Sequence, residues 1–96
     1  KHDVDAVKPK WNEAKQVFFA ELIRNFELNS NWNAHDLETG FKEMAAAHQI
    51  KPSELLLPLR IMLVGGKFGP HIFDIAELLG REETVARIKR LLALLQ

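Results

Sequence analysis

Arg60 stands in the middle of an otherwise apolar run, LLLPLRIMLV, which spans residues 55–64. A guanidinium is planar and always charged, so on a buried helix it needs either a carboxylate partner or an exposed position for its head. The same flat group can stack on or hydrogen-bond to a nucleic-acid base or phosphate. The pattern leaves both interpretations of Arg60 open, a structural ion pair and a nucleic-acid contact.

A glycine-rich turn, GGKFGPH, follows this run at residues 65–71. Glycine followed by Lys67 is reminiscent of a phosphate-binding loop, but such a loop places Ser or Thr after the lysine and follows a strand. Here Phe68 follows Lys67, and we expect no strand before the turn. The pattern favours Gly65 and Gly66 as a helix stop.

The histidines and acidic residues are not spaced for catalysis or metal binding. No two of the four histidines are separated by four positions, and the chain has no cysteine; the histidines are His2, His35, His48 and His71. No local Ser-His-Asp signature or marked carboxylate pair is present. We therefore expect neither a catalytic site nor a metal site in these residues.

Composition limits the class of protein. The chain has 96 residues, is 47% hydrophobic, and balances 13 Lys and Arg against 13 Asp and Glu. These values predict one globular domain without a membrane span, and the lack of cysteine fits a reducing cytosol. Neutral charge argues against a free-standing, salt-driven nucleic-acid binder but permits a module that reads bases. Since residue 1 is not Met, we expect a piece of a longer protein.

Helical periodicity predicts an all-α bundle of five or six helices with short loops. A first helix, over about residues 10–26, has apolar residues at three- and four-residue spacing: Trp11, Ala14, Phe18, Leu22 and Phe26. Asn33 is predicted to cap a second helix. That helix contains Gly40, for which we expect close packing, and has one face formed by Leu37, Phe41, Met44, Ala45 and His48.

Three more helices complete the prediction. The third begins with Lys51-Pro52-Ser53, contains Pro58, is apolar nearly all round and should be the most buried. The fourth helix spans Pro70 to Leu79 and is stopped by Gly80. The last helix spans about Glu82 to Leu95, and its inward face is formed by Val85, Ile88, Leu91, Leu92 and Leu95. Aromatic residues at helical spacing lie in a core more often than they stack on bases, so we expect Trp11 and Trp32 in the core. Four basic residues are expected on a solvated face: Arg81, Arg87, Lys89 and Arg90.

One extended string of residues is more specific than this periodicity. It consists of Pro58-Leu59-Arg60, Leu63, Gly65, GPHIFD at residues 69–74, LGREET at residues 79–84, Arg87 and Ile88. This string strongly resembles the C-terminal anticodon-binding region of bacterial glutamyl-tRNA synthetases. Trp32-Asn33-Ala34 and residues 3–11 resemble that family as well, so the resemblance covers essentially the whole chain.

The resemblance implies a role within a larger enzyme. The chain would be a single domain over residues 1–96, the distal half of a helical cage around the anticodon loop of tRNA-Glu. The parent would be a class I, cytoplasmic ligase that joins glutamate to tRNA. Its catalytic domain, where ATP and Mg²⁺ are expected, would lie upstream; this fragment would carry no catalytic site and no cofactor. Expected partners are tRNA-Glu and the remainder of the synthetase, with no membrane and no DNA.

The resemblance also assigns site residues. Arg60 corresponds to the family's arginine that contacts an anticodon base, and Gly69, Pro70 and Ile72 correspond to residues that line the base pockets. Lys67, as a phosphate contact, and His71 are further candidates. A helix that begins at Pro70 would point its positive end at the turn. The chain departs from the family at Gly69, where many members carry Thr or Ser.

Two other classes of function remain open on the residues alone. One is a small helical protein-interaction domain, in which Arg60 is only a core ion pair. The other is a helix-turn-helix DNA binder that uses the helix from Glu82, with Arg87, Lys89 and Arg90. Steeply salt-dependent duplex binding would favour the DNA binder, and a lack of nucleic-acid binding at low salt would favour the interaction domain.

Overall fold

The computed structural model describes residues 4–66 and 69–95, and within these ranges the chain is helical without strands, which confirms the all-α prediction. Two short 3₁₀ helices, η1 (Val4–Ala6) and η2 (Lys8–Lys10), precede the α-helices. The α-helices are α1 (Glu13–Leu28), α2 (Ala34–Ala47), α3 (Pro52–Val64), α4 (Ile72–Leu79) and α5 (Arg81–Leu95).

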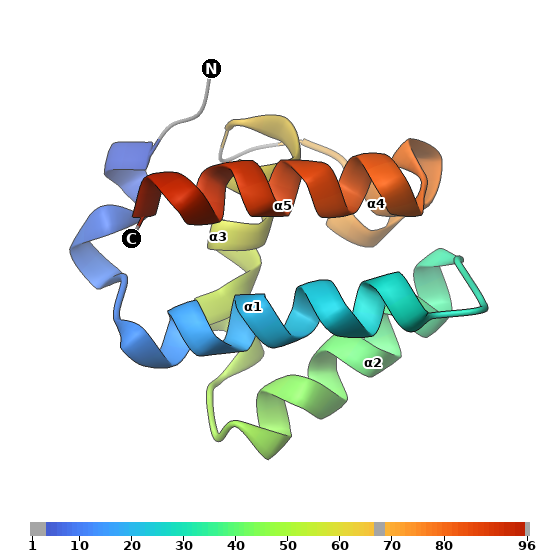
Figure 1. Cartoon of the computed structure of the whole chain (residues 1–96), viewed down its shortest axis with the longest axis horizontal. Coiled ribbons are helices and arrows are strands. Elements are labelled where there is room, and N and C mark those ends of the chain that lie inside the picture. The colour runs from blue at the N-terminus through green and yellow to red at the C-terminus, as the bar shows by residue number, and fades with distance from the viewer. Residues whose placement is uncertain (1–3, 67–68, 96) are drawn as a thin grey trace.

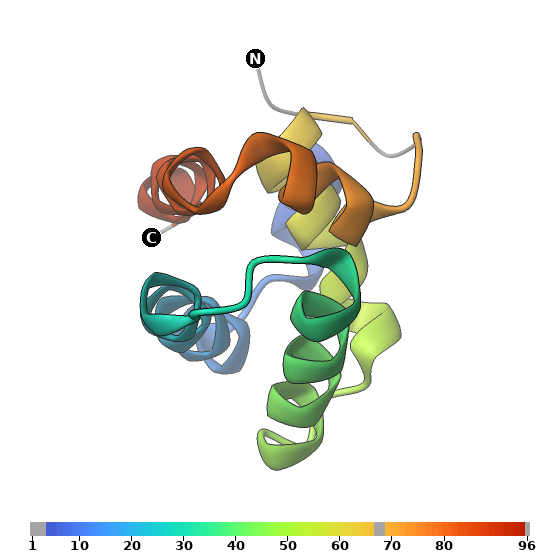
Figure 2. The same cartoon turned by 90° about the vertical axis from the view of Figure 1, so that its right-hand side faces the viewer.

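The helices pack around α3. In Figure 1, α1 and α5 run side by side in opposite directions, and α3 crosses behind them. Figure 2 shows α4 lying over the N-terminal end of α2. The molecule measures 33 × 28 × 21 Å.

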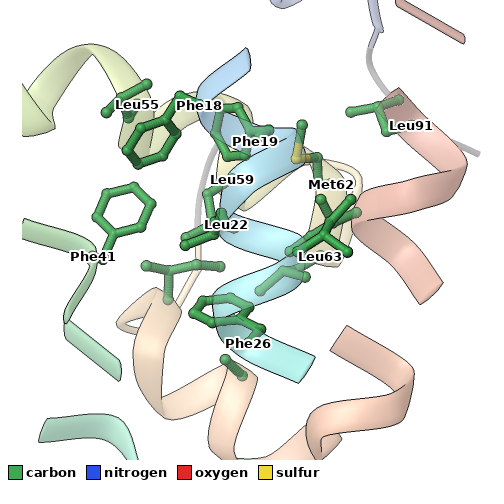
Figure 3. Close-up of a cluster of buried hydrophobic side chains, with 14 of the residues drawn as sticks. Phe18, Phe19, Leu22, Phe26, Phe41, Leu55, Leu59, Met62, Leu63 and Leu91 are labelled. Atoms are coloured by element: carbon green, nitrogen blue, oxygen red, sulfur yellow. The ribbon is translucent and has the colours of Figure 1, made fainter. Parts of the chain in front are cut away.

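The prediction that α3 is the central helix is confirmed. Five of its side chains are at most 1% exposed: Leu55, Leu59, Ile61, Met62 and Leu63. Figure 3 shows some of them among aromatic and aliphatic side chains from α1, including Phe18, Phe19 and Leu22. Pro58 lies inside α3 and is also buried. These buried side chains fix the position of the single arginine of α3.

The predicted inner face of α1 is wrong at Ala14, which is exposed, while the next residue, Lys15, is 6% exposed. The Lys15 ammonium donates to the Lys10 carbonyl at 2.9 Å and lies 4.0 Å from a Glu54 carboxylate oxygen. Its methylene chain can thus fill the core while its charge is partly satisfied. The helix begins at Glu13 instead of Lys10 because the Asn12 side chain accepts a hydrogen bond from the Lys15 amide at 2.9 Å.

The tryptophans have structural contacts. Trp32 donates its indole N–H to the Ala76 carbonyl at 2.9 Å, which joins the α1–α2 connection to α4. Trp11 stacks on Phe19, with ring centroids 5.7 Å apart, and its indole N–H donates to Gln16 at 3.2 Å. These contacts favour the core interpretation of both residues over the base-stacking one.

Several predicted helix ends are confirmed. The Asn33 side chain caps α2 by accepting from the Asp36 amide at 2.9 Å. Gly65 ends α3 with φ 79°, and Gly80 follows α4 with φ 86°. Both backbones lie in the region that glycine adopts without steric cost. The second helix stops at Ala47, so His48 is its cap and not part of the helix.

Close packing does not explain Gly40, contrary to our expectation. A Cβ atom placed on Gly40 would have no neighbouring atom within 4 Å, apart from the adjacent residues and the helix's own backbone. The residue lies on the wall of an open groove between α1 and α2. Glycine therefore lowers the stability of the helix by about 1 kcal/mol relative to alanine, and no packing contact offsets this loss.

Gly40→Ala should accordingly increase the free energy of unfolding by about 1 kcal/mol, because alanine lowers the backbone entropy lost on folding. Denaturant unfolding monitored by circular dichroism measures the change. Gly80→Ala is the matched control: at φ 86° the same substitution should destabilise the fold. A destabilised Gly40→Ala variant would contradict this account of α2.

Candidate functional site

The candidate site is the connection between α3 and α4, together with the side chains beside it. The structure describes Gly65, Gly66, Gly69, Pro70 and His71 of this connection. The predicted phosphate contact, Lys67, lies outside the described residues. Gly69, Pro70 and His71 are exposed, so Gly69 presents its backbone to solvent.

Arg60 and Gly69 lie against each other. A Cβ atom built on Gly69 would be 3.2 Å from Nη1 of Arg60. The arginine as a whole is half-buried, but Nη1 is shielded from solvent and has no hydrogen-bond partner among the described residues. Within the same residues Arg60 forms no salt bridge, since every ion pair there joins other side chains. The ion-pair interpretation of Arg60 therefore finds no support in the described part of the chain.

The backbone at Gly69 has a conformation that favours glycine. Its φ is 148°, a region that residues with a side chain rarely adopt. A side chain would also press on the Arg60 guanidinium. Thr or Ser at this position would thus require a different backbone or a displaced arginine.

His71 is the N-cap of α4, and the helix begins at Ile72, so the predicted start at Pro70 is wrong. The His71 Nδ1 atom accepts a hydrogen bond from the Phe73 amide at 3.3 Å. This side-chain cap places the helix start after the proline, because the cap residue keeps a non-helical backbone. Pro70 is left in the exposed turn, outside α4.

Ile72 points into the core rather than into the turn. Its side chain is 4% exposed, and that of the next residue, Phe73, is 1% exposed. The Phe73 ring meets Phe41 of α2 edge-on, with centroids 5.3 Å apart. Together these residues fix α4 on α2. Of the predicted candidates, the structure brings Arg60 and Gly69 into contact and keeps Pro70 and His71 exposed beside them.

Glu38 of α2 is a neighbour of the turn that the sequence did not reveal. One of its carboxylate oxygens, Oε1, lies 3.9 Å from Nε2 of His71. The other, Oε2, pairs with the Lys42 ammonium at 2.8 Å. The hydrogen bond from Lys42 lowers the pKa of the Glu38 carboxyl, and the positive charge of Lys42 acts in the same direction. The Glu38–Lys42 spacing of four residues indicates a surface pair on a helix, but only the fold places it beside His71.

The sequence predicted that the basic residues of α5 form one solvated face, and this prediction is wrong for two of them. Arg87 donates to the Leu63 carbonyl at 2.5 Å and to the Glu83 carboxylate at 2.7 Å, so it supports the C-terminal end of α3. That hydrogen bond from Arg87 also lowers the pKa of Glu83. Arg81 lies over the Trp32 ring, 5.6 Å from its centroid, and donates to the Asn29 carbonyl. Both arginines are half-buried.

The other two basic residues of α5 are exposed, as predicted. Lys89 pairs with Glu27 of α1 at 3.2 Å, and Arg90 lies on the surface nearby. Over the described ranges, no cluster of three or more His, Asp or Glu side chains has a geometry that could hold a metal ion. Across the same ranges, no helix is long and apolar enough to cross a membrane.

The chain matches the family model described as "Anticodon binding domain" over residues 1–92. A glutamate–tRNA ligase from Flavobacterium johnsoniae is 36% identical over 85 residues, which are 88% of this chain and 17% of that protein. Those from Chlorobium phaeovibrioides and Porphyromonas gingivalis are 33% and 35% identical over 94 residues, 98% of this chain and 18% of each relative. The chain thus spans less than a fifth of these relatives. No solved structure matches it.

Gly69→Ala should lower the free energy of unfolding by about 1–3 kcal/mol, because it strains the backbone and crowds Arg60. Denaturant unfolding monitored by tryptophan fluorescence measures the loss. Gly66→Ala is the matched control in the same turn: its Cβ meets nothing within 4 Å and its φ lies outside the strained region. Equal effects of the two substitutions would show that Gly69 has no special conformational role.

Proposed function

The chain belongs to the anticodon-binding domain family, and we propose that it binds the anticodon loop of tRNA-Glu as part of a glutamate–tRNA ligase. In this proposal the single domain of residues 1–96 is the distal half of the anticodon-binding region. The catalytic domain, which uses ATP and Mg²⁺ to activate glutamate in the cytoplasm, is a separate part of the enzyme. This chain contributes tRNA recognition and no catalytic group.

The observation that carries the proposal is the position of Arg60 beneath the exposed turn. Arg60 has no carboxylate partner among residues 4–66 and 69–95, and such a guanidinium is available for a ligand that offers flat or hydrogen-bonding groups. Its Nη1 is covered by Gly69, so a base would meet the remainder of the half-buried side chain. The buried helix α3 holds this group in place before a ligand arrives, which reduces the ordering cost of binding.

The exposed turn supplies the other features that unpaired bases require. Bases in a loop can be unstacked, and proteins read them through stacking and through hydrogen bonds to their edges. Pro70 offers an apolar surface, and the turn's exposed backbone offers N–H and C=O groups. With 13 basic and 13 acidic residues, the chain has no excess charge to hold phosphates. Binding should therefore depend on base contacts more than on salt-sensitive attraction.

The helix-turn-helix alternative is weakened by the contacts of α5. Arg87 is engaged with the Leu63 carbonyl and Glu83, and Lys89 is paired with Glu27. Of the three basic residues in that interpretation, Arg90 alone is exposed and has no partner among the described residues. One free arginine gives little of the basic surface that duplex DNA requires.

Arg60→Ala should weaken binding of a tRNA-Glu anticodon stem-loop by about 1–3 kcal/mol, the loss expected for one base contact. Fluorescence anisotropy with a labelled stem-loop measures the dissociation constant. Arg90→Ala removes the same charge from the exposed face of α5 and is the matched control, with little expected effect. Circular dichroism establishes that both variants are folded.

Two results would count against the proposal. If Arg90→Ala weakens binding as much as Arg60→Ala does, the turn has no privileged role and general electrostatic attraction explains the affinity. If the unmodified chain does not bind the stem-loop even at low salt, the chain does not recognise the loop by itself.

A further inference from the structure

Glu38 is an unexpected group beside a surface that would bind a polyanion. It lies on α2, is 33% exposed at its side chain, and is 3.9 Å from the His71 ring of the turn. Carboxylates repel phosphates, so an acidic side chain at this place weakens any contact that relies on charge alone. A carboxylate at this place can instead accept hydrogen bonds from a partner that donates them.

The two oxygens of Glu38 have different surroundings. Oε2 accepts from Lys42 at 2.8 Å, which anchors the carboxylate on the surface of α2. Oε1 faces Nε2 of His71 at 3.9 Å, beyond the range of a direct hydrogen bond. Oε1 therefore retains its capacity to accept from another molecule. A carboxylate is ionised at neutral pH and only accepts hydrogen bonds, and the hydrogen bond from Lys42 lowers the pKa of Glu38 further in that direction.

His71 is oriented by its role as a helix cap. Since Nδ1 accepts from the Phe73 amide, the proton of the neutral imidazole is carried on Nε2. The Nε2–H group is then a donor that points to the side of Glu38. The side chain is 53% exposed, so this donor is open to a ligand. The same cap that starts α4 thus fixes the direction of a hydrogen-bond donor.

We propose that Glu38 and His71 form a second base-recognition pair at the rim of the turn, separate from Arg60. Oε1 of Glu38 accepts an amino or imino N–H from an anticodon base, and Nε2–H of His71 donates to the acceptor beside it on the same base edge. This inference rests on the proposed function and names further residues of that site.

The chemistry of base edges fits this pair. The Watson–Crick edge of every base has a donor next to an acceptor. Adenine and cytosine present an amino donor followed by a ring-nitrogen acceptor, whereas guanine and uracil present a carbonyl acceptor followed by an imino donor. A carboxylate accepts but cannot donate, so an edge that presents a lone pair to Glu38 is repelled. The pair can therefore reject a wrong base as well as hold the right one, which is how specificity is commonly obtained.

The direction in which Glu38→Ala changes the affinity for the stem-loop tests this inference. Removing an acidic side chain from a polyanion-binding surface should ordinarily strengthen binding, whereas Glu38→Ala should weaken binding of the tRNA-Glu stem-loop about tenfold, because a base contact is lost. Glu43→Ala is the control, since Glu43 is exposed on the same helix but lines the groove between α1 and α2. It should leave affinity unchanged or slightly increase it.

A second variant tests discrimination between bases. Glu38→Gln keeps the size of the side chain and one carbonyl acceptor but adds an amide donor. It should bind the tRNA-Glu loop more weakly than the unmodified chain and lose part of its preference over a loop with substituted anticodon bases. Fluorescence anisotropy at one fixed salt concentration gives all dissociation constants, and circular dichroism reports the fold of each variant.

The outcomes separate this inference from the proposed function. If Arg60→Ala weakens binding while Glu38→Ala binds as well as or better than the unmodified chain, the Glu38–His71 pair has no role in recognition and the inference is overturned. If the unmodified chain does not bind the loop, the proposed function fails, and the inference fails with it.

Discussion

The burial of α3 is the constraint on which the candidate site depends. Its buried apolar side chains fix the position of α3 relative to the other helices. The packing of the core therefore sets the direction in which the Arg60 side chain points. At its C-terminal end, Arg87 binds the Leu63 carbonyl and Gly65 turns the chain with φ 79°. The guanidinium then meets the backbone of Gly69, where a Cβ atom would lie 3.2 Å from its Nη1. An exposed turn is thereby in contact with a side chain of the central helix.

The charges near this turn are better suited to discriminating between bases than to attracting the phosphate backbone. The chain is neutral overall, and the basic side chains of α5 are largely engaged in contacts with α1, α3 and the connection before α2. Beside the turn lie a cation, an acid and an imidazole, each with its direction set by a local contact: Arg60, Glu38 and His71. Such a mixed arrangement distinguishes hydrogen-bonding patterns. Strong attraction to the phosphate backbone would have to come from other parts of the enzyme.

Much of the fold could be predicted because helix periodicity and end signals are local. The Asn33 cap, the Gly65 stop and the inward face of α5 follow from spacing and side-chain chemistry alone. The buried Lys15 could not be predicted, since a backbone carbonyl and the packing of α3 decide its burial. Resemblance to a family indicated the turn as the site. The position of Glu38 beside it depends on how α2 and α4 pack, a tertiary contact that spacing in the sequence does not encode.

An NMR amide titration of the 96-residue chain with a tRNA-Glu anticodon stem-loop, and with a loop carrying substituted anticodon bases, tests the central claim most directly. The account predicts shifts centred on Arg60, Gly69, His71 and Ile72 that are reduced with the substituted loop. Shifts of equal size with both loops, or shifts centred on the exposed face of α5 around Arg90, would contradict base reading by the turn.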